Sequence, residues 1–150
     1  MKTRQRADDG LRALIVDNLR LLRGSVVHWQ PIESPLMAAG IPDLEGCWCG
    51  RPIWVECKAT STYTLATLTE FQIGWAVCRA RSGGTTWIAT RRRHGGGPRK
   101  GEPVDQLWLH RGDAAPRLRE FGLSMTEYQY SEDGGPPAWD WERFGLLLFT

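Results

Sequence analysis

Apolar residues near the start of the chain recur at helical spacing. They follow Asp8 and Asp9, either of which can cap a helix, and fall at Leu11, Leu14, Ile15, Leu19 and Leu22, about one turn apart except for the adjacent pair Leu14 and Ile15. This spacing places them along one side of a helix, and Gly24 is a typical residue at a helix C-terminus. The pattern therefore predicts a helix from residue 8 or 9 to about residue 23, with one buried stripe.

Short runs rich in apolar and β-branched residues follow, separated by Pro and Gly. They predict strands over five ranges: Ser25–Gln30, Ile41–Cys47, Pro52–Lys58, Thr85–Thr90 and Asp105–His110. Trp48-Cys49-Gly50 separates the second range from the third. A short connection that contains Gly between two such runs predicts a β-hairpin.

Two further helices are predicted. The first begins near Thr67 or Thr69 and ends at Gly83-Gly84, and its residues Phe71, Trp75 and Cys78 are expected to face the core. The second runs from Asp113 to Phe121, with Pro116 in its first turn. The order of elements predicts one α/β domain over residues 1–150, in which helices flank a mixed β-sheet. Its core would span about residues 8–123. A C-terminal extension, residues 124–150, shows no clear element.

Length and composition place the chain among ordinary globular domains. It has 150 residues, of which 41% are hydrophobic, enough to bury a core. No apolar run approaches the roughly 20 residues of a membrane span, and no signal-peptide core follows the basic N-terminus. We therefore expect a cytoplasmic protein without a membrane partner.

The four cysteines are expected to be reduced in that compartment. Cys47 and Cys49 have one residue between them and no second pair of ligands, which is not the usual arrangement of a structural zinc site. Cys57 and Cys78 are expected to be small core residues.

Basic residues are concentrated in one segment. Between residues 79 and 100 the basic residues are Arg79, Arg81, Arg91, Arg92, Arg93, Arg99 and Lys100, and there is no acid. One interpretation is a solvated surface. The other is a flexible loop between two strands, formed by Arg91, Arg92, Arg93, Arg99 and Lys100, that contacts a polyanion, and it would bind the phosphates of DNA if the protein is a nuclease.

Two charged residues interrupt the apolar strand predicted over residues 52–58. Residues two apart on a strand point to the same face, so Glu56 and Lys58 share one face while Val55 and Cys57 share the other. Asp43, on the preceding strand, can lie beside them. Two carboxylates with backbone carbonyls suit Mg²⁺ or Mn²⁺, and a nearby lysine can stabilise charge on a phosphodiester. The alternative is an exposed hairpin with an ordinary Glu–Lys pair. The metal site requires Asp43 to reach the face of Glu56 and Lys58.

Pro42-Asp43 followed by Glu56-Cys57-Lys58 resembles the signature of the PD-(D/E)XK nuclease superfamily. The context, Gly40-Ile41-Pro42-Asp43-Leu44 and Leu68-Thr69-Glu70-Phe71-Gln72, is similar to that of the small phage and virus-type replication-repair nucleases (VRR-NUC), a group that also contains Holliday-junction-resolvase-like proteins. The similarity covers about residues 8–90. It implies a restriction-endonuclease-like core in which Asp43, Glu56 and the backbone carbonyl of Cys57 bind Mg²⁺ or Mn²⁺. Lys58 would be the catalytic lysine, and Gln72 would support the site or contact the scissile strand.

The resemblance further implies an endodeoxyribonuclease of phage or prophage origin that works in the host cytoplasm. It would hydrolyse phosphodiester bonds of branched, flap or junction DNA, leave a 5′-phosphate, and be able to form a homodimer. Many relatives carry a Glu on the first helix, so here Asp8, Asp9 or Glu33 would replace it, or the role is absent.

Two other classes of function stay open. One is a non-catalytic nucleic-acid-binding module on the same fold, although such a module has no use for intact Asp43, Glu56 and Lys58. The other is an interaction or inhibitor protein, for which the acidic Trp139-Asp140-Trp141 segment is the only indication.

Overall fold

The computed structural model describes residues 8–33, 39–96, 98 and 101–150. The strands are β1 (Leu21–Leu22), β2 (Ser25–Val26), β3 (His28–Pro31), β4 (Leu44–Trp48), β5 (Arg51–Thr60), β6 (Thr86–His94), β7 (Val104–Arg111) and β8 (Tyr130–Glu132). The helices are α1 (Leu11–Asn18), α2 (Glu70–Arg81), α3 (Ala115–Phe121) and α4 (Trp141–Phe149), and a short 3-10 helix, η2 (Gly112–Ala114), precedes α3.

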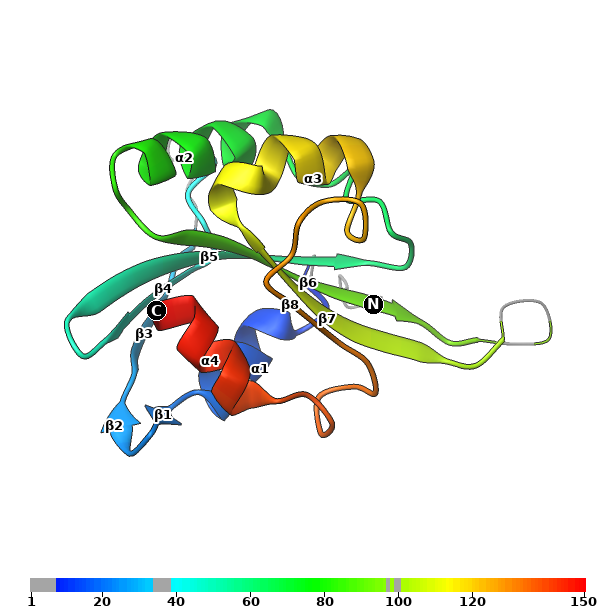
Figure 1. Cartoon of the computed structure of the whole chain (residues 1–150), viewed down its shortest axis with the longest axis horizontal. Coiled ribbons are helices and arrows are strands. Elements are labelled where there is room, and N and C mark those ends of the chain that lie inside the picture. Colours follow the sequence, from blue (N-terminus) through cyan, green and yellow to red (C-terminus); the bar gives the residue numbers. More distant parts are fainter. Residues whose placement is uncertain (1–7, 34–38, 97, 99–100) are drawn as a thin grey trace.

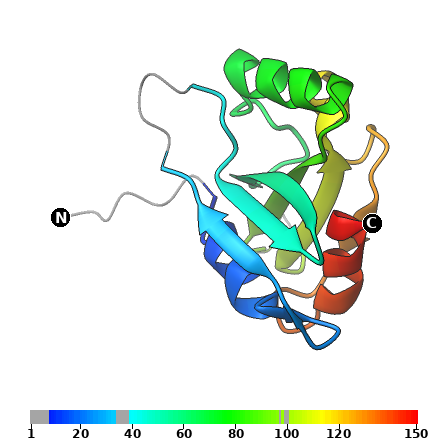
Figure 2. The ribbon, with the colours of Figure 1, turned by 90° about the vertical axis from the view of Figure 1, so that its left-hand side faces the viewer.

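Within these residues, six strands form one sheet in the order β3-β4-β5-β6-β7-β8, and β1 and β2 form a separate hairpin. Helices α2 and α3 cover one face of the sheet, and α1 and α4 cover the other (Figure 1). Seen from the side, α2 lies above the sheet and α1 below it, near the edge strand β3 (Figure 2). The predicted class, an α/β protein with a central mixed sheet flanked by helices, is confirmed.

The pairing of β5 explains the position of α2. β5 is antiparallel to β4 but parallel to β6, and parallel neighbours need a crossover connection, which α2 supplies. The turn between β4 and β5 is formed by Cys49 and Gly50, with φ of 49° and 78°. Two consecutive positive φ values are typical of a type I′ hairpin turn, so the predicted hairpin is confirmed.

Two apolar clusters lie on opposite faces of the sheet. The larger one joins α1 and α4 to the strands and includes Leu11, Ile15, Val55 and Phe144. The smaller one lies under α2 and α3 and includes Leu65, Leu68, Ile88, Trp108, Leu118 and Leu123. Because both faces are covered, side chains on either side of β5 are removed from solvent.

The first helix is shorter than predicted. It ends at Asn18, and the β1–β2 hairpin follows, with Arg23 and Gly24 at its turn in the left-handed region (φ 49° and 79°). Gly24 therefore closes a hairpin and not a helix. Leu19 and Leu22 are nevertheless buried, because they keep contact with the core after the helix has ended.

The prediction for the buried face of α2 is wrong for Phe71 and Cys78, whereas Trp75 is half-buried and packs on Trp54 of β5, with ring centroids 5.3 Å apart. Phe71 is 70% exposed and Cys78 is exposed as well, whereas Ala76 is buried. Residues four apart share a helix face, so the face that carries Gln72 and Ala76 is the one turned to the sheet. Phe71 and Cys78 consequently point away from it, and Cys78 is not a core residue.

The C-terminal segment contains both a strand and a helix. β8 extends the sheet beside β7, and α4 closes the α1 face. Five of its side chains are buried in the larger apolar cluster: Tyr130, Trp139, Phe144, Leu148 and Phe149. Residues 124–150 therefore belong to the same core as the strands.

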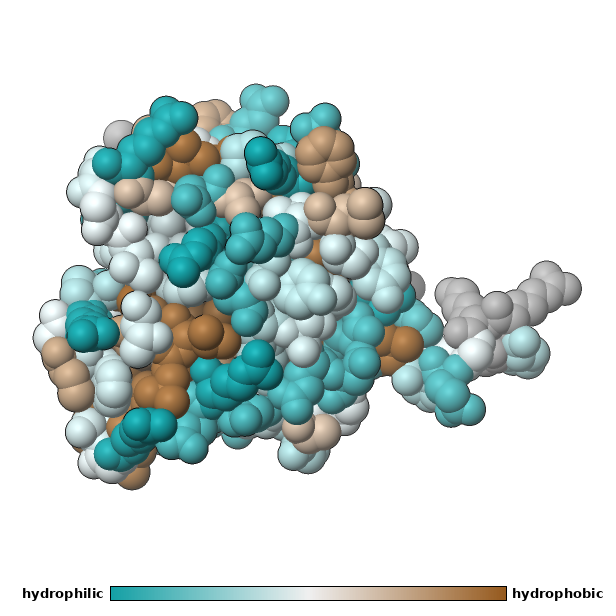
Figure 3. All heavy atoms as spheres, viewed as in Figure 1, coloured by the Kyte–Doolittle hydropathy of each residue, from teal (hydrophilic) through white to brown (hydrophobic). Residues whose placement is uncertain are grey.

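In the part of the chain that the structure describes, no helix has both the length and the apolar character to cross a membrane. The surface shown in Figure 3 is mostly polar, and its apolar residues gather near α4 and the β1–β2 hairpin, where Leu21 and Val26 are 59% and 72% exposed.

Candidate active site

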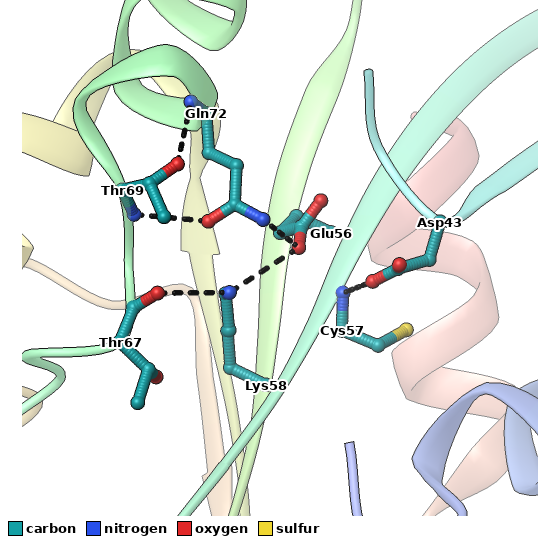
Figure 4. A network of polar contacts seen from close by, with 7 residues as sticks. All are labelled: Asp43, Glu56, Cys57, Lys58, Thr67, Thr69 and Gln72. Carbon is teal, nitrogen blue, oxygen red and sulfur yellow. Dashed lines mark hydrogen bonds and ion pairs between the residues drawn. The ribbon is translucent and has the colours of Figure 1, made fainter. Parts of the chain in front are cut away.

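The candidate site forms where β4 and β5 separate. Their last pair is Leu44 with Val55, so Asp43 and the residues after Val55 are no longer joined backbone to backbone. Instead the Asp43 carboxylate accepts a hydrogen bond from the backbone N–H of Cys57 at 2.9 Å (Figure 4). The separation leaves a pocket of about 350 Å³, lined by Asp8, Arg12, Glu33, Asp43, Glu56, Cys57, Lys58 and Gln72.

The expected convergence of the three charged residues is present. Asp43 lies at the edge of β5 and lines the same pocket as Glu56 and Lys58. Glu56 and Lys58 are only 5% and 7% exposed, since α2 and the segment before it cover their face of the sheet. The alternative of an exposed hairpin with a surface Glu–Lys pair is therefore wrong.

The two carboxylate oxygens of Glu56 have different surroundings. Oε1 accepts a hydrogen bond from Gln72 Nε2 at 2.8 Å and lies 3.5 Å from Lys58 Nζ. Oε2 is buried and accepts no hydrogen bond from a donor group of the described residues, and the adjacent Asp43 carboxylate can share a proton with the Glu56 carboxyl group. A buried carboxylate oxygen without a partner is costly, so this atom is suited to a cation or a water that enters the pocket.

Gln72 is held in place by the start of its helix. Thr69 Oγ1 accepts a hydrogen bond from the Gln72 backbone N–H, and Gln72 Oε1 accepts one from the Thr69 backbone N–H. These two bonds form a capping box. The side-chain oxygen of Gln72 accepts one of these bonds, so the side-chain Nε2 is left to donate to Glu56.

Lys58 is anchored at its ammonium group. Nζ donates to the backbone carbonyl of Thr67 at 3.1 Å, in addition to its contact with Glu56 (Figure 4). An ammonium has three N–H donors, so one remains for a ligand in the pocket.

Burial dominates the electrostatics of the two acids. It raises the pKa of Glu56 to about 8, and the neighbouring Asp43 carboxylate raises it further than Lys58 lowers it. Burial also raises the pKa of Asp43, against the opposing effect of the Cys57 N–H. A divalent cation between the two groups would favour their ionised forms.

The backbone carbonyl of Cys57 is directed to the same side. In an extended strand the N–H and C=O of one residue point to the same neighbour, and the Cys57 N–H points to Asp43. The carbonyl therefore faces the gap that β4 leaves. Within the described residues, no group of three or more His, Cys, Asp or Glu side chains is placed to hold a metal ion. A Mg²⁺ site needs only one or two carboxylates, with waters and substrate phosphate completing its shell, and Asp43, Glu56 and this carbonyl fit that requirement.

The acids proposed for the first helix behave differently from one another. Asp8 lines the pocket, but its carboxylate oxygens accept hydrogen bonds from the backbone N–H groups of Gly10 and Arg12. Asp9 pairs with Arg93, at 2.6 Å. Glu33 lines the pocket with its side chain 93% exposed. Asp9 is thus engaged elsewhere, Asp8 is held by backbone N–H groups at the pocket, and Glu33 has Arg12 at 4.0 Å as its nearest cation among the described residues.

The basic segment is not the flexible loop that the sequence predicts. Arg91, Arg92 and Arg93 lie within β6, which continues to His94. Arg91 forms two hydrogen bonds with Asp105, and Arg92 donates to Gln106 and stacks on the Tyr63 ring. Both are 8% exposed, so their guanidinium groups are used inside the protein. Arg99 and Lys100 lie outside the described residues.

Three residues of the site escape prediction from the sequence. The Thr67 carbonyl and the Arg12 side chain carry no sequence signal, because their positions depend on how a loop and a helix pack. Thr69 carries one: Thr-x-x-Gln before a helix is a capping-box pattern, and it accounts for the orientation of Gln72.

No protein-family model matches this chain, and no curated protein sequence matches it significantly. Functional assignment therefore depends on the geometry of the pocket and on the motif itself.

Proposed function

We propose that this protein is a Mg²⁺- or Mn²⁺-dependent DNA endonuclease of the PD-(D/E)XK superfamily, with a restriction-endonuclease-like core and VRR-NUC-type relatives. The observation that carries the proposal is the buried, unpartnered Oε2 of Glu56 in a pocket shared with Asp43 and Lys58. Two carboxylates beside a lysine are the donor set that a divalent cation with a substrate phosphate uses, and Oε2 is open to such a cation because no described residue donates a hydrogen bond to it.

Asp43, Glu56 and the Cys57 carbonyl are the groups that would hold the metal ion. A bound Mg²⁺ or Mn²⁺ supplies positive charge next to the phosphate and makes a water more acidic. Glu56 lies on β5 and Asp43 lies just before β4, and the hydrogen bond from the Cys57 N–H to Asp43 keeps the two carboxylates together.

Lys58 and Gln72 have distinct tasks in the proposed reaction. Hydrolysis forms a bond between a water oxygen and phosphorus and breaks the bond to one ester oxygen, which leaves with a proton. Negative charge grows on the phosphoryl oxygens meanwhile. The free N–H of Lys58 can donate to these oxygens. Gln72 instead orients the Glu56 carboxylate, because its Nε2 donates a hydrogen bond to Oε1 of Glu56. Gln72 is thus a positioning residue.

A cleavage assay tests the proposal. The protein is incubated with labelled single-stranded, duplex, flap and four-way-junction DNA in Mg²⁺, Mn²⁺ or EDTA. We expect cleavage with either metal and none in EDTA, and the panel also identifies the DNA structure that is preferred. If the folded protein cuts none of these substrates with metal present, the endonuclease proposal is wrong. DNA binding without cleavage would favour the non-catalytic nucleic-acid-binding module.

Variants test the site separately from the activity. Glu56→Gln keeps the shape of the side chain but weakens its affinity for a cation, so we expect cleavage to fall at least about 100-fold and Mg²⁺ to stop raising the melting temperature. Glu45→Gln on β4 makes the same chemical change outside the pocket and should match the parent. Equal cleavage by Glu56→Gln and the parent would refute the site while leaving the activity standing.

A further inference from the structure

We propose that Arg12 binds a phosphate group of the DNA substrate inside the candidate pocket. This inference rests on the proposed function, since it assigns the recognition of substrate phosphate to a residue outside the Asp43–Glu56–Lys58 motif. Arg12 lies on the first helix, where many members of the nuclease superfamily that the motif resembles carry a Glu.

Arg12 reaches the pocket from the opposite layer of the protein. It lies in the first turn of α1, on the face of the sheet away from α2, and it lines the pocket together with Glu56, Lys58 and Gln72 from the other side. The Asp8 carboxylate accepts a hydrogen bond from its backbone N–H at 3.2 Å. The backbone of Arg12 is therefore held at the pocket rim, and the side chain extends from a fixed point.

The guanidinium group of Arg12 has no strong partner within residues 8–33, 39–96, 98 and 101–150. Its side chain is only 24% exposed, and its nearest acid is Glu33, at 4.0 Å with a side chain 93% exposed. Among the described residues it makes no side-chain hydrogen bond, in contrast to Arg91, which forms two with Asp105. A half-buried guanidinium with five N–H donors and no close acceptor is suited to an anion from outside the protein.

Phosphate is the anion that this pocket fits. A guanidinium matches the geometry of phosphate oxygens with two parallel hydrogen bonds, and a phosphodiester that reaches Lys58 enters the pocket that Arg12 also lines. The nearby acid Asp8 has both oxygens engaged by backbone N–H groups. The first helix thus contributes a positive charge to the pocket, and Asp8, just before the helix, is held in place by backbone N–H groups.

DNA binding in EDTA measures this role without cleavage. The affinity for a labelled single-stranded oligonucleotide is determined over a range of salt concentrations for the parent, Arg12→Ala, Arg12→Lys and Arg20→Ala. The Arg20→Ala substitution is a matched control because it removes the same charge outside the pocket. The Arg20 side chain is 71% exposed and paired with Asp17. We expect Arg12→Ala to bind about tenfold more weakly or worse and to lower the salt slope by about 0.7. Arg12→Lys should keep the slope while losing part of the affinity, and Arg20→Ala should match the parent.

The stability of the variants distinguishes phosphate binding from a structural role. Arg12→Ala and Arg12→Gln should melt near the parent, and Mg²⁺ should raise their melting temperatures by at least as much, since no positive charge then opposes the cation. If Arg12→Ala does not fold, Arg12→Gln provides the same binding test. The inference is overturned if a folded Arg12 variant binds DNA with the affinity and salt slope of the parent. It is also overturned if Mg²⁺ no longer raises the melting temperature of that variant, or if the parent does not bind DNA.

The two proposals can fail separately. A parent that binds DNA through Arg12 but cuts none of the substrates would refute the endonuclease and leave Arg12 as a phosphate-binding residue. A parent that cuts DNA, with an Arg12→Ala variant that binds and cuts equally well, would refute only the role of Arg12.

Discussion

Glu56 combines the two demands on a metal-binding acid, burial and charge. Its pKa of about 8, against an ordinary 4.5, means that the folded protein without metal holds a proton that the unfolded chain releases. Between pH 4.5 and pH 8 the native state therefore binds more protons than the unfolded state. The free energy of unfolding contributed by Glu56 is highest below pH 4.5, falls as pH rises through this window, and levels off above about pH 8.

The first prediction concerns this pH dependence. We expect the parent in EDTA to lose stability relative to Glu56→Gln as pH rises from 5 to 8.5, measured as the difference between their unfolding free energies in urea. Mg²⁺ should stabilise the parent more at pH 8 than at pH 5, because the cation competes with the proton. Burial lowers the pKa of His110, so the contribution of His110 to the free energy of unfolding rises with pH below pH 6.5, opposite to that of Glu56. Because both proteins contain His110, the difference between the parent and Glu56→Gln cancels this contribution. A difference independent of pH would contradict the prediction.

At the scale of elements, the start of α2 links secondary structure to the site. Thr69 and Gln72 cap the helix together, but only Gln72 also donates to Glu56. The second prediction is that Thr69→Ala and Gln72→Ala both lose about 1 kcal/mol of stability, while their activities differ. Cleavage by Thr69→Ala should stay near that of the parent. Cleavage by Gln72→Ala should fall about tenfold or more, because Glu56 loses a hydrogen bond to a charged group.

Single-turnover cleavage with saturating DNA measures this difference, with denaturant unfolding as the stability control. If Gln72→Ala and Thr69→Ala both cut DNA as fast as the parent, Gln72 acts only as a capping residue. The proposed positioning of Glu56 would then be wrong, although the capping box would stand.

The helix that carries Gln72 also shows how far element prediction from sequence extends. The existence of α2 and its end near Gly83 follow from spacing and glycine, but its buried face does not. Phe71, Trp75 and Cys78 match a helical period, yet Gln72 and Ala76 lie on the sheet side. A prediction from hydrophobic periodicity assumes that the most apolar face of a helix is the buried one. In α2 the face turned to the sheet instead carries the polar side chain of Gln72, which belongs to the site.

The same limit applies to the basic segment and to the first helix. Charge counts predict a solvated or DNA-binding loop, but Asp105 and Gln106 on the neighbouring strand supply partners for Arg91 and Arg92. These partners are known only once the register of β6 and β7 is known. Asp43, Glu56 and Lys58 could be predicted because strand period and motif spacing concern residues on two adjacent strands. Arg12 could not, since its place at the pocket depends on contacts between layers.

At the scale of the whole molecule, the C-terminal segment supports the sheet from the side opposite α2. Phe144 is fully buried and packs edge to face on Tyr130, with ring centroids 5.4 Å apart. The carbonyl of Leu148 accepts a hydrogen bond from the indole N–H of Trp87 on β6, the strand beside β5. Deleting a buried ring in such a place leaves a cavity next to the strands that carry the site.

The last prediction is that Phe144→Ala lowers the free energy of unfolding by about 3–5 kcal/mol. Phe121→Ala is the matched control, because Phe121 ends α3 and is 56% exposed, and it should change stability by about 0.5 kcal/mol or less. Urea denaturation followed by tryptophan fluorescence measures both. Similar small losses in the two variants would mean that residues 124–150 add little to the fold. A large loss in Phe144→Ala alone would establish that the C-terminal helix completes the core on which β5 and its acidic residues rest.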